Sequence, residues 1–234
     1  MNIKNMKWFV VMLLVTFTGC SIIQPYRPVP LPEDEARKRI SNRLSQWEIC
    51  TARGIANVYD KNYEFKSDFL LRKKKEKIKL DAFTTGLLGI SPSIKLQILY
   101  TDSLQVFVPE RKTLYTYSSK KFVPLSPSHI STAPVHYDSD SKKFILFYEN
   151  IKMTFNQDFD LEIISYNDIK ILFTQYKKSL PYQIDVWDGR NLLGRLLIDS
   201  WEFGEIKTQI FSLSIPSDSD VQIVPISRLT DIKL

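Results

Sequence analysis

The sequence predicts a mainly β protein with one long helix. The expected architecture is an incompletely closed antiparallel β-barrel of about 10–12 strands, plugged or covered by an N-terminal amphipathic helix. Residues that suit strands are frequent, with 14 Phe and 11 Tyr among 234 residues. Short segments of alternating polarity, separated by turn residues, fill most of the chain from residue 54 to residue 203. Only the segment near residues 34–49 has clear helical spacing.

The composition argues against two classes of function, nucleotide binding through a glycine-rich loop and nucleic-acid binding. The chain has only 7 Gly, which argues against a glycine-rich nucleotide loop, and we expect no cofactor. Its formal net charge is +6, and removal of Lys4 and Lys7 with the N-terminal segment leaves about +4 by subtraction. This mild excess suits an anionic membrane surface but is too small for a nucleic-acid partner.

The N-terminal residues resemble a bacterial lipoprotein signal peptide. Lys4 and Lys7 precede the apolar run Trp8–Phe17, which at about ten residues is too short to span a bilayer. The small residues Thr18 and Gly19 then precede Cys20. The resemblance implies that residues 1–19 are removed and that Cys20 is acylated on its sulfur and its amine, which ties the protein to the membrane. An ordinary secretory signal that happens to contain a cysteine is the alternative.

The residue after Cys20 bears on the location of the protein. Ser21 is not the aspartate that typically retains such lipoproteins at the inner membrane, so the resemblance implies a lipid anchor on the periplasmic face of the outer membrane.

Cys50 is then the only thiol besides the anchor and has no internal disulfide partner, so we expect it to be buried and inert.

The mature chain is expected to contain three regions. Residues 20–33 carry four prolines, which disfavour a helix and predict an extended tether. Residues 34–204 form the barrel domain, which begins with a helix whose apolar positions are Ala36, Ile40, Leu44 and Trp47. Residues 205–234 are a C-terminal extension of irregular structure. The predicted strands are 54–60, 63–72, 77–83, 93–100, 104–110, 112–118, 143–149, 151–157, 160–166, 169–177, 181–188 and 191–203.

The order of these elements resembles the LolA/LolB lipoprotein-carrier family, and LolB more than LolA because of the acylated cysteine. The resemblance rests on "WEICTARGIANVY" after the helix, on "IKLDAFTTGLLGISPSIKLQI", and on the final hairpin "LPYQIDVWDGRNLLGRLLIDSWEF". It covers roughly residues 35–204 at low identity. Residues 118–142 depart from it, since they are polar and contain prolines where the family usually carries helical cover over the cavity.

The resemblance implies a cavity between sheet and helix that holds the acyl chains of lipoproteins. Alternating apolar positions supply the expected lining: Ile55, Phe65, Phe69, Leu80, Ile98, Val106, Leu146, Phe155, Ile171 and Ile184. A filled β core would use the same residues and is the alternative. The loop with Leu87, Leu88 and Ile90 is expected to insert into the membrane, and folding back into the core is its alternative. The basic run 72–77 is assigned to a solvated hairpin turn, and contact with an anionic lipid or with the carrier is its alternative.

The resulting hypothesis is an outer-membrane-anchored lipoprotein that binds acyl chains and takes part in placing lipoproteins in that membrane. A soluble periplasmic carrier is a candidate partner. The alternative is an envelope assembly or interaction lipoprotein that keeps the fold without cargo. An enzyme is not expected: Ser128, His129 and Asp138 suggest a triad by composition only, without a strand–turn–helix elbow, and the spacing of His129 and His136 defines no metal site.

Overall fold

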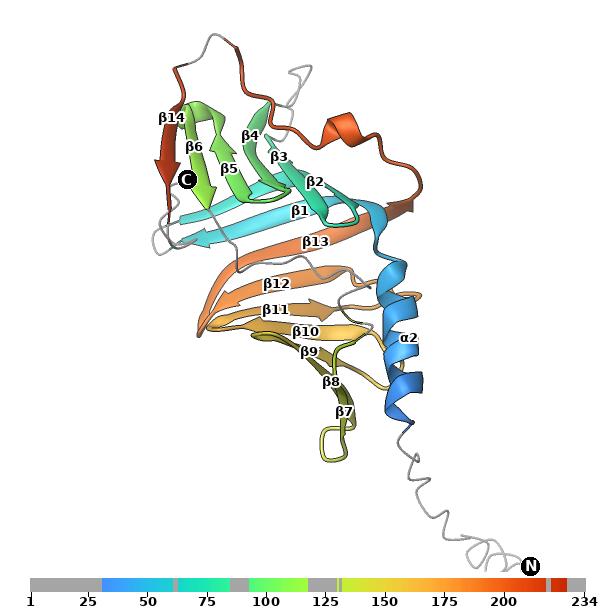
Figure 1. Cartoon of the computed structure of the whole chain (residues 1–234). Coiled ribbons are helices and arrows are strands. Elements are labelled where there is room, and N and C mark those ends of the chain that lie inside the picture. The colour runs from blue at the N-terminus through green and yellow to red at the C-terminus, as the bar shows by residue number, and fades with distance from the viewer. Residues whose placement is uncertain are drawn as a thin grey trace, which may run out of the picture. The chain divides into compact units, whose positions relative to one another are not determined.

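The computed structural model describes residues 31–60, 63–84, 93–117, 130, 132–217 and 220–226. The elements described below lie in the unit Glu33–Leu234. They are labelled as in Figure 1. Their bounds are α2 Glu33–Ser45, β1 Ile49–Asp60, β2 Tyr63–Lys74, β3 Lys77–Phe83, β4 Ile94–Tyr100, β5 Leu104–Val108, η1 Pro109–Arg111, β6 Thr113–Tyr117, β7 Val135–Asp138, β8 Lys143–Tyr148, β9 Ile151–Phe155, β10 Leu161–Tyr166, β11 Ile169–Thr174, β12 Gln183–Asp188, β13 Asn191–Phe203, η2 Thr208–Ile210 and β14 Gln222–Pro225.

All the described strands belong to a single curled sheet of 14 strands, in the order β14-β6-β5-β4-β3-β2-β1-β13-β12-β11-β10-β9-β8-β7. Neighbouring strands are antiparallel except for β14, which runs parallel to β6. The end strands β14 and β7 are not paired with each other, so the barrel stays open (Figure 1). The predicted fold class is therefore confirmed. The strands β7 and β14 come from segments that the sequence analysis left irregular.

Helix α2 is shorter than its apolar spacing predicted. Acidic residues occupy its first turn and Arg43 its last, which complements the helix dipole, and Ala36 and Ile40 are buried. The helix ends at Ser45, because the backbone N–H groups of Trp47 and Glu48 donate to carbonyls three residues earlier in a tight turn. The prediction that Trp47 continues the buried stripe of the helix is therefore wrong. Trp47 lies in the turn that leads into β1.

The pairing register divides the sheet into two faces of opposite character. Paired residues point to the same side and successive residues to opposite sides, so the faces can be followed from strand to strand. One face, here called the apolar face, includes Ala52, Phe69 and Ala82, which are buried. The other, called the polar face, includes Arg72, Asp81 and Gln97 in adjacent positions. The following sections refer to these two faces.

A glycine permits the close pairing of β1 with β13. The register shifts between Arg53 and Gly54, which marks a β-bulge. A Cβ atom on Gly54 would lie 1.9 Å from the carbonyl oxygen of Leu197, a distance that no side chain tolerates. Gly54 is thus required by this backbone contact within β1.

The segment that follows β13 covers part of the polar face. Ile206 and Phe211 are buried against Leu99, and the backbone N–H of Ser214 donates to Gln97 Oε1 at 2.9 Å. The segment then leads to β14, which pairs with β6. Part of the predicted irregular extension is therefore an integral part of the sheet domain.

Beneath this segment lies a buried charged network. The carboxylate of Asp81, whose residue is 4% exposed, accepts a hydrogen bond from Gln97 Nε2 at 2.7 Å and pairs with Arg72 Nη1 at 2.8 Å. Lys79 Nζ lies 3.5 Å from the same carboxylate. These contacts pair the Asp81 carboxylate with cations and a hydrogen-bond donor, which offsets the loss of water where the covering segment lies over the network.

Candidate functional site

The apolar face gathers most of the residues predicted to line a cavity. Following the register from β6 through β1 to β7 places nine of the ten predicted residues on this face. They are Phe65, Phe69, Leu80, Ile98, Val106, Leu146, Phe155, Ile171 and Ile184. Ile55 lies on the polar face, because it is paired with Asp68 and Leu197 while its neighbours Gly54 and Ala56 occupy the apolar face.

Burial of these nine residues is uneven. Leu146 and Phe155 are completely buried on β8 and β9, and Phe69 and Val106 are 3% exposed. Four aliphatic residues in the middle of the sheet remain only partly buried: Leu80, Ile98, Ile171 and Ile184. The central strands therefore present aliphatic surface that the described part of the chain does not completely cover, which is what a long apolar ligand requires.

Helix α2 and its following turn cover the apolar face at the β7–β13 end. The ring of Trp47 packs at 5.7 Å from Phe173 and at 6.0 Å from Trp201, both of which belong to this face. The guanidinium of Arg39 lies 5.6 Å above Phe159, which stacks on Phe144 of β8. The helix thus packs on the fully buried part of the face and leaves the central strands less covered.

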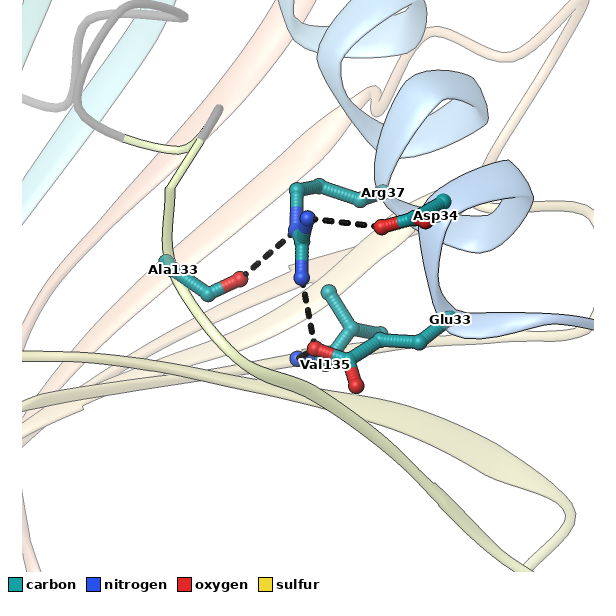
Figure 2. A network of polar contacts seen from close by, with 5 residues as sticks. All are labelled: Glu33, Asp34, Arg37, Ala133 and Val135. Atoms are coloured by element: carbon teal, nitrogen blue, oxygen red, sulfur yellow. Dashed lines mark hydrogen bonds and ion pairs between the residues drawn. The ribbon is translucent and has the colours of Figure 1, made fainter.

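A polar network fixes the start of α2 to the chain entering β7 (Figure 2). Arg37 Nε donates to the Ala133 carbonyl at 3.0 Å, while its other nitrogens contact Asp34 and Glu33 at 3.0 and 2.6 Å. The Glu33 carboxylate also accepts the Val135 N–H at 3.2 Å. The Val135 N–H and the Arg37 guanidinium lower the pKa of Glu33, because both stabilise the charged carboxylate.

Cys50 lies at the rim of the apolar face. The residue is 2% exposed, and burial raises the pKa of its thiol to about 11. The expected burial of this cysteine is confirmed, and its thiol is neutral at physiological pH.

Several predicted site residues lie outside the described residues. These are Cys20, the loop residues Leu87, Leu88 and Ile90, and the enzyme candidates Ser128 and His129. The neck of that loop is described: Thr84 and Ser93 are joined by backbone and side-chain hydrogen bonds where β3 ends and β4 begins. His136 is exposed on β7, and the Asp138 carboxylate accepts hydrogen bonds from Ser141 Oγ and from the Asp140 N–H. In the described part of the chain, no helix is long and apolar enough to cross a bilayer.

The solved structures that resemble this one include the following two. A LolA superfamily protein from Nitrosomonas europaea superposes with a TM-score of 0.50 and 11% identity, covering 77% of this chain and 97% of that protein. A DUF1329 family protein from Desulfovibrio piger superposes with a TM-score of 0.51 and 10% identity, covering 77% of this chain and 96% of that protein. No protein-family model and no curated protein matches the chain in sequence. At these identities the likeness concerns the fold alone: the chain has a LolA-like fold.

Proposed function

We propose that this protein is an envelope lipoprotein that holds acyl chains on its apolar face and takes part in placing lipoproteins in the outer membrane. The observation that carries the proposal is the partly buried aliphatic surface formed by Leu80, Ile98, Ile171 and Ile184. An acyl chain laid on this surface removes apolar area from water, which stabilises the complex by about 25 cal/mol per Å² buried. The LolA-like fold supports the same class of ligand.

Acylation of Cys20 is the proposed membrane tie. The N-terminal sequence supports it, and multiple acyl chains on one cysteine anchor far more strongly than a single chain. The proposed site is the periplasmic face of the outer membrane, where a soluble periplasmic carrier is the candidate donor. Radiolabelled palmitate should be incorporated into the wild-type chain and not into a Cys20→Ala variant. Equal labelling of both would contradict the anchor.

The loop between β3 and β4 is proposed to enter the membrane during delivery. Its tip carries Leu87, Leu88 and Ile90, and its neck is fixed by the Thr84–Ser93 hydrogen bonds. Replacing Leu87 and Leu88 by Glu should abolish lipoprotein delivery while leaving the thermal unfolding midpoint unchanged. Full delivery by this double variant would remove the loop from the account.

The proposed activity is binding and transfer without catalysis. It uses shape and apolar surface, and it requires no cofactor. The apolar face supports this, since the central lining residues named above are hydrocarbon and carry no nucleophile or general base.

The test is the lipid content of the Cys20→Ala chain purified from cells without detergent. Mass spectrometry of an organic extract should find bound acyl species in this protein. Ile171→Glu should remove them, because it places a charge on the apolar face. Lys170→Glu is the matched control, since Lys170 is exposed on the opposite face of the same strand. A lipid-free Cys20→Ala chain would instead favour the interaction lipoprotein without cargo.

A further inference from the structure

Lys73 departs from the solvated turn to which the basic run 72–77 was assigned. The hairpin turn is formed by Lys75 and Glu76, which are exposed, whereas Lys73 is still within β2. Its register partners are Cys50 on β1 and Ile78 on β3, and all three point to the apolar face. Among the described side chains of β1 to β6, Lys73 is the only charged one on that face.

The ammonium of Lys73 is partly desolvated and lacks a close anion. No hydrogen bond or ion pair joins it to another described residue. Burial lowers the pKa of Lys73, against the smaller opposing effects of Cys50, Glu48 and Glu76. The Cys50 thiol, which has the largest of these three effects, is neutral because burial raises its pKa to about 11. A cation in this position gains from an anionic ligand more than an exposed lysine does.

A second donor without a partner lies in the turn just before β1, whose second residue, Cys50, is paired with Lys73. The indole N–H of Trp47 is buried and finds no acceptor among the described residues. The Trp47 ring packs on Trp201, which is paired with Ala52 of β1. Lys73 is paired with Cys50, two residues before Ala52 on the same strand. Lys73 lies two strands from Trp201, about 10 Å across the sheet. A buried N–H and an ammonium, both without a partner among the described residues, therefore lie near the first residues of β1.

We propose that the rim of the apolar face near Cys50 binds the anionic head group of an acyl amphiphile, with Lys73 as its ion-pair partner and the Trp47 N–H as a second donor. The acyl tail then extends from the rim over Leu80 and Ile98 toward the centre of the face. This inference rests on the acyl-binding face of the proposed function and adds a second class of ligand beside the acyl chains of lipoproteins: a single-headed monoanionic amphiphile. The shared chemistry of a fatty-acid carboxylate and a lysophospholipid phosphodiester is one negative charge with free oxygen acceptors.

The test measures the affinity of the Cys20→Ala chain for three amphiphiles by displacement of a fluorescent acyl probe. These are oleate, oleoyl lysophosphatidylglycerol and the uncharged oleyl alcohol. Lys73→Met should weaken binding of the two anions about tenfold, the loss expected for one charge-assisted hydrogen bond, while leaving oleyl alcohol within about twofold. Lys73→Arg should restore the preference for anions. Trp47→Phe, which keeps a ring and removes the N–H, should weaken the anions but not the alcohol.

Lys66→Met is the matched control, because Lys66 is an exposed lysine on the polar face of the same strand and should leave all three affinities unchanged. If Lys73→Met changes the three ligands equally, or none of them, the head-group site is refuted while acyl binding stands. If the parent chain binds none of the three, the proposed function itself fails. A loss for one anion only identifies that head group as the ligand.

Discussion

Truncation of two leucines distinguishes an open apolar face from a filled core. Leu146 is completely buried on β8, and Leu80 is only partly buried on β3, although both belong to the apolar face. Leu146→Ala should lower the free energy of unfolding by about 3 kcal/mol, since it leaves a cavity in packed surroundings. Leu80→Ala should cost only about 1–2 kcal/mol, because part of that side chain is already in contact with water.

Guanidinium denaturation of the two variants in the Cys20→Ala background measures both values. The slope of unfolding free energy against denaturant should stay constant, so that midpoints report stability alone. Saturating oleate should stabilise the parent chain and stabilise Leu80→Ala less, because binding to the folded state shifts the equilibrium by mass action. If Leu80→Ala costs as much as Leu146→Ala and oleate changes neither, the face is packed solid and the reasoning is refuted.

Other predictions concern the elements that hold the face in place. Gly54→Ala should lower the free energy of unfolding by at least about 2 kcal/mol, because its Cβ would collide with the Leu197 carbonyl oxygen. Asp81→Ala should cost about 3 kcal/mol in the same denaturation assay, because it leaves the buried Lys79 and the partly buried Arg72 without their anion. The hydrogen bond from the Val135 N–H to Glu33 should weaken in acid, because the folded-state pKa of Glu33 lies below its ordinary 4.5. The contribution of Glu33 to stability is therefore complete above pH 4.5 and is lost as pH falls through the lower folded-state pKa. Hydrogen exchange at the Val135 amide should record that loss.

Each of these changes has a control on the same molecule. Gly189→Ala meets no atom within 4 Å and should cost only about 1 kcal/mol, from its positive φ. Asp68→Ala removes an exposed carboxylate from β2 and should stay within about 0.5 kcal/mol of the parent. Glu33→Gln should make exchange at Val135 independent of this titration. Costs as large as those of Gly54→Ala and Asp81→Ala, or an unchanged acid dependence in Glu33→Gln, would contradict the assigned contacts.

Alternation of polarity predicted the sheet well, because most strands have one apolar and one polar face. It placed nine lining residues on one face but not Ile55. In β1 both faces carry apolar residues, and small side chains such as Ala52 and Ala56 occupy the apolar face. Period-two reasoning weighs hydrophobicity and cannot tell a small inward residue from a large outward one in such a strand.

Of the missed strands, β14 depends on a contact distant in sequence, because it pairs with β6, whereas β7 closes a local hairpin with β8 in which Asp138 pairs with Lys143. Strands β7 and β14 are four residues each, and they form by adding to the edges β8 and β6. Helix α2 ended early because the turn into β1 competed with continued helical spacing. The place of Lys73 on the apolar face could have been predicted from the sequence, because it follows Phe69 and Leu71 at the same two-residue spacing. The surrounding run of charged residues favoured a solvated turn instead.

The most direct test of an open acyl-binding face is nuclear Overhauser contact between a ¹³C-labelled oleate chain and assigned methyl groups of the Cys20→Ala protein. The account predicts cross-peaks from the chain to methyls of Leu80, Ile98 and Ile184, and none to Ile55 on the polar face. Cross-peaks to Ile55 without those to the other three, or no contact with any of the four at saturating oleate, would contradict it.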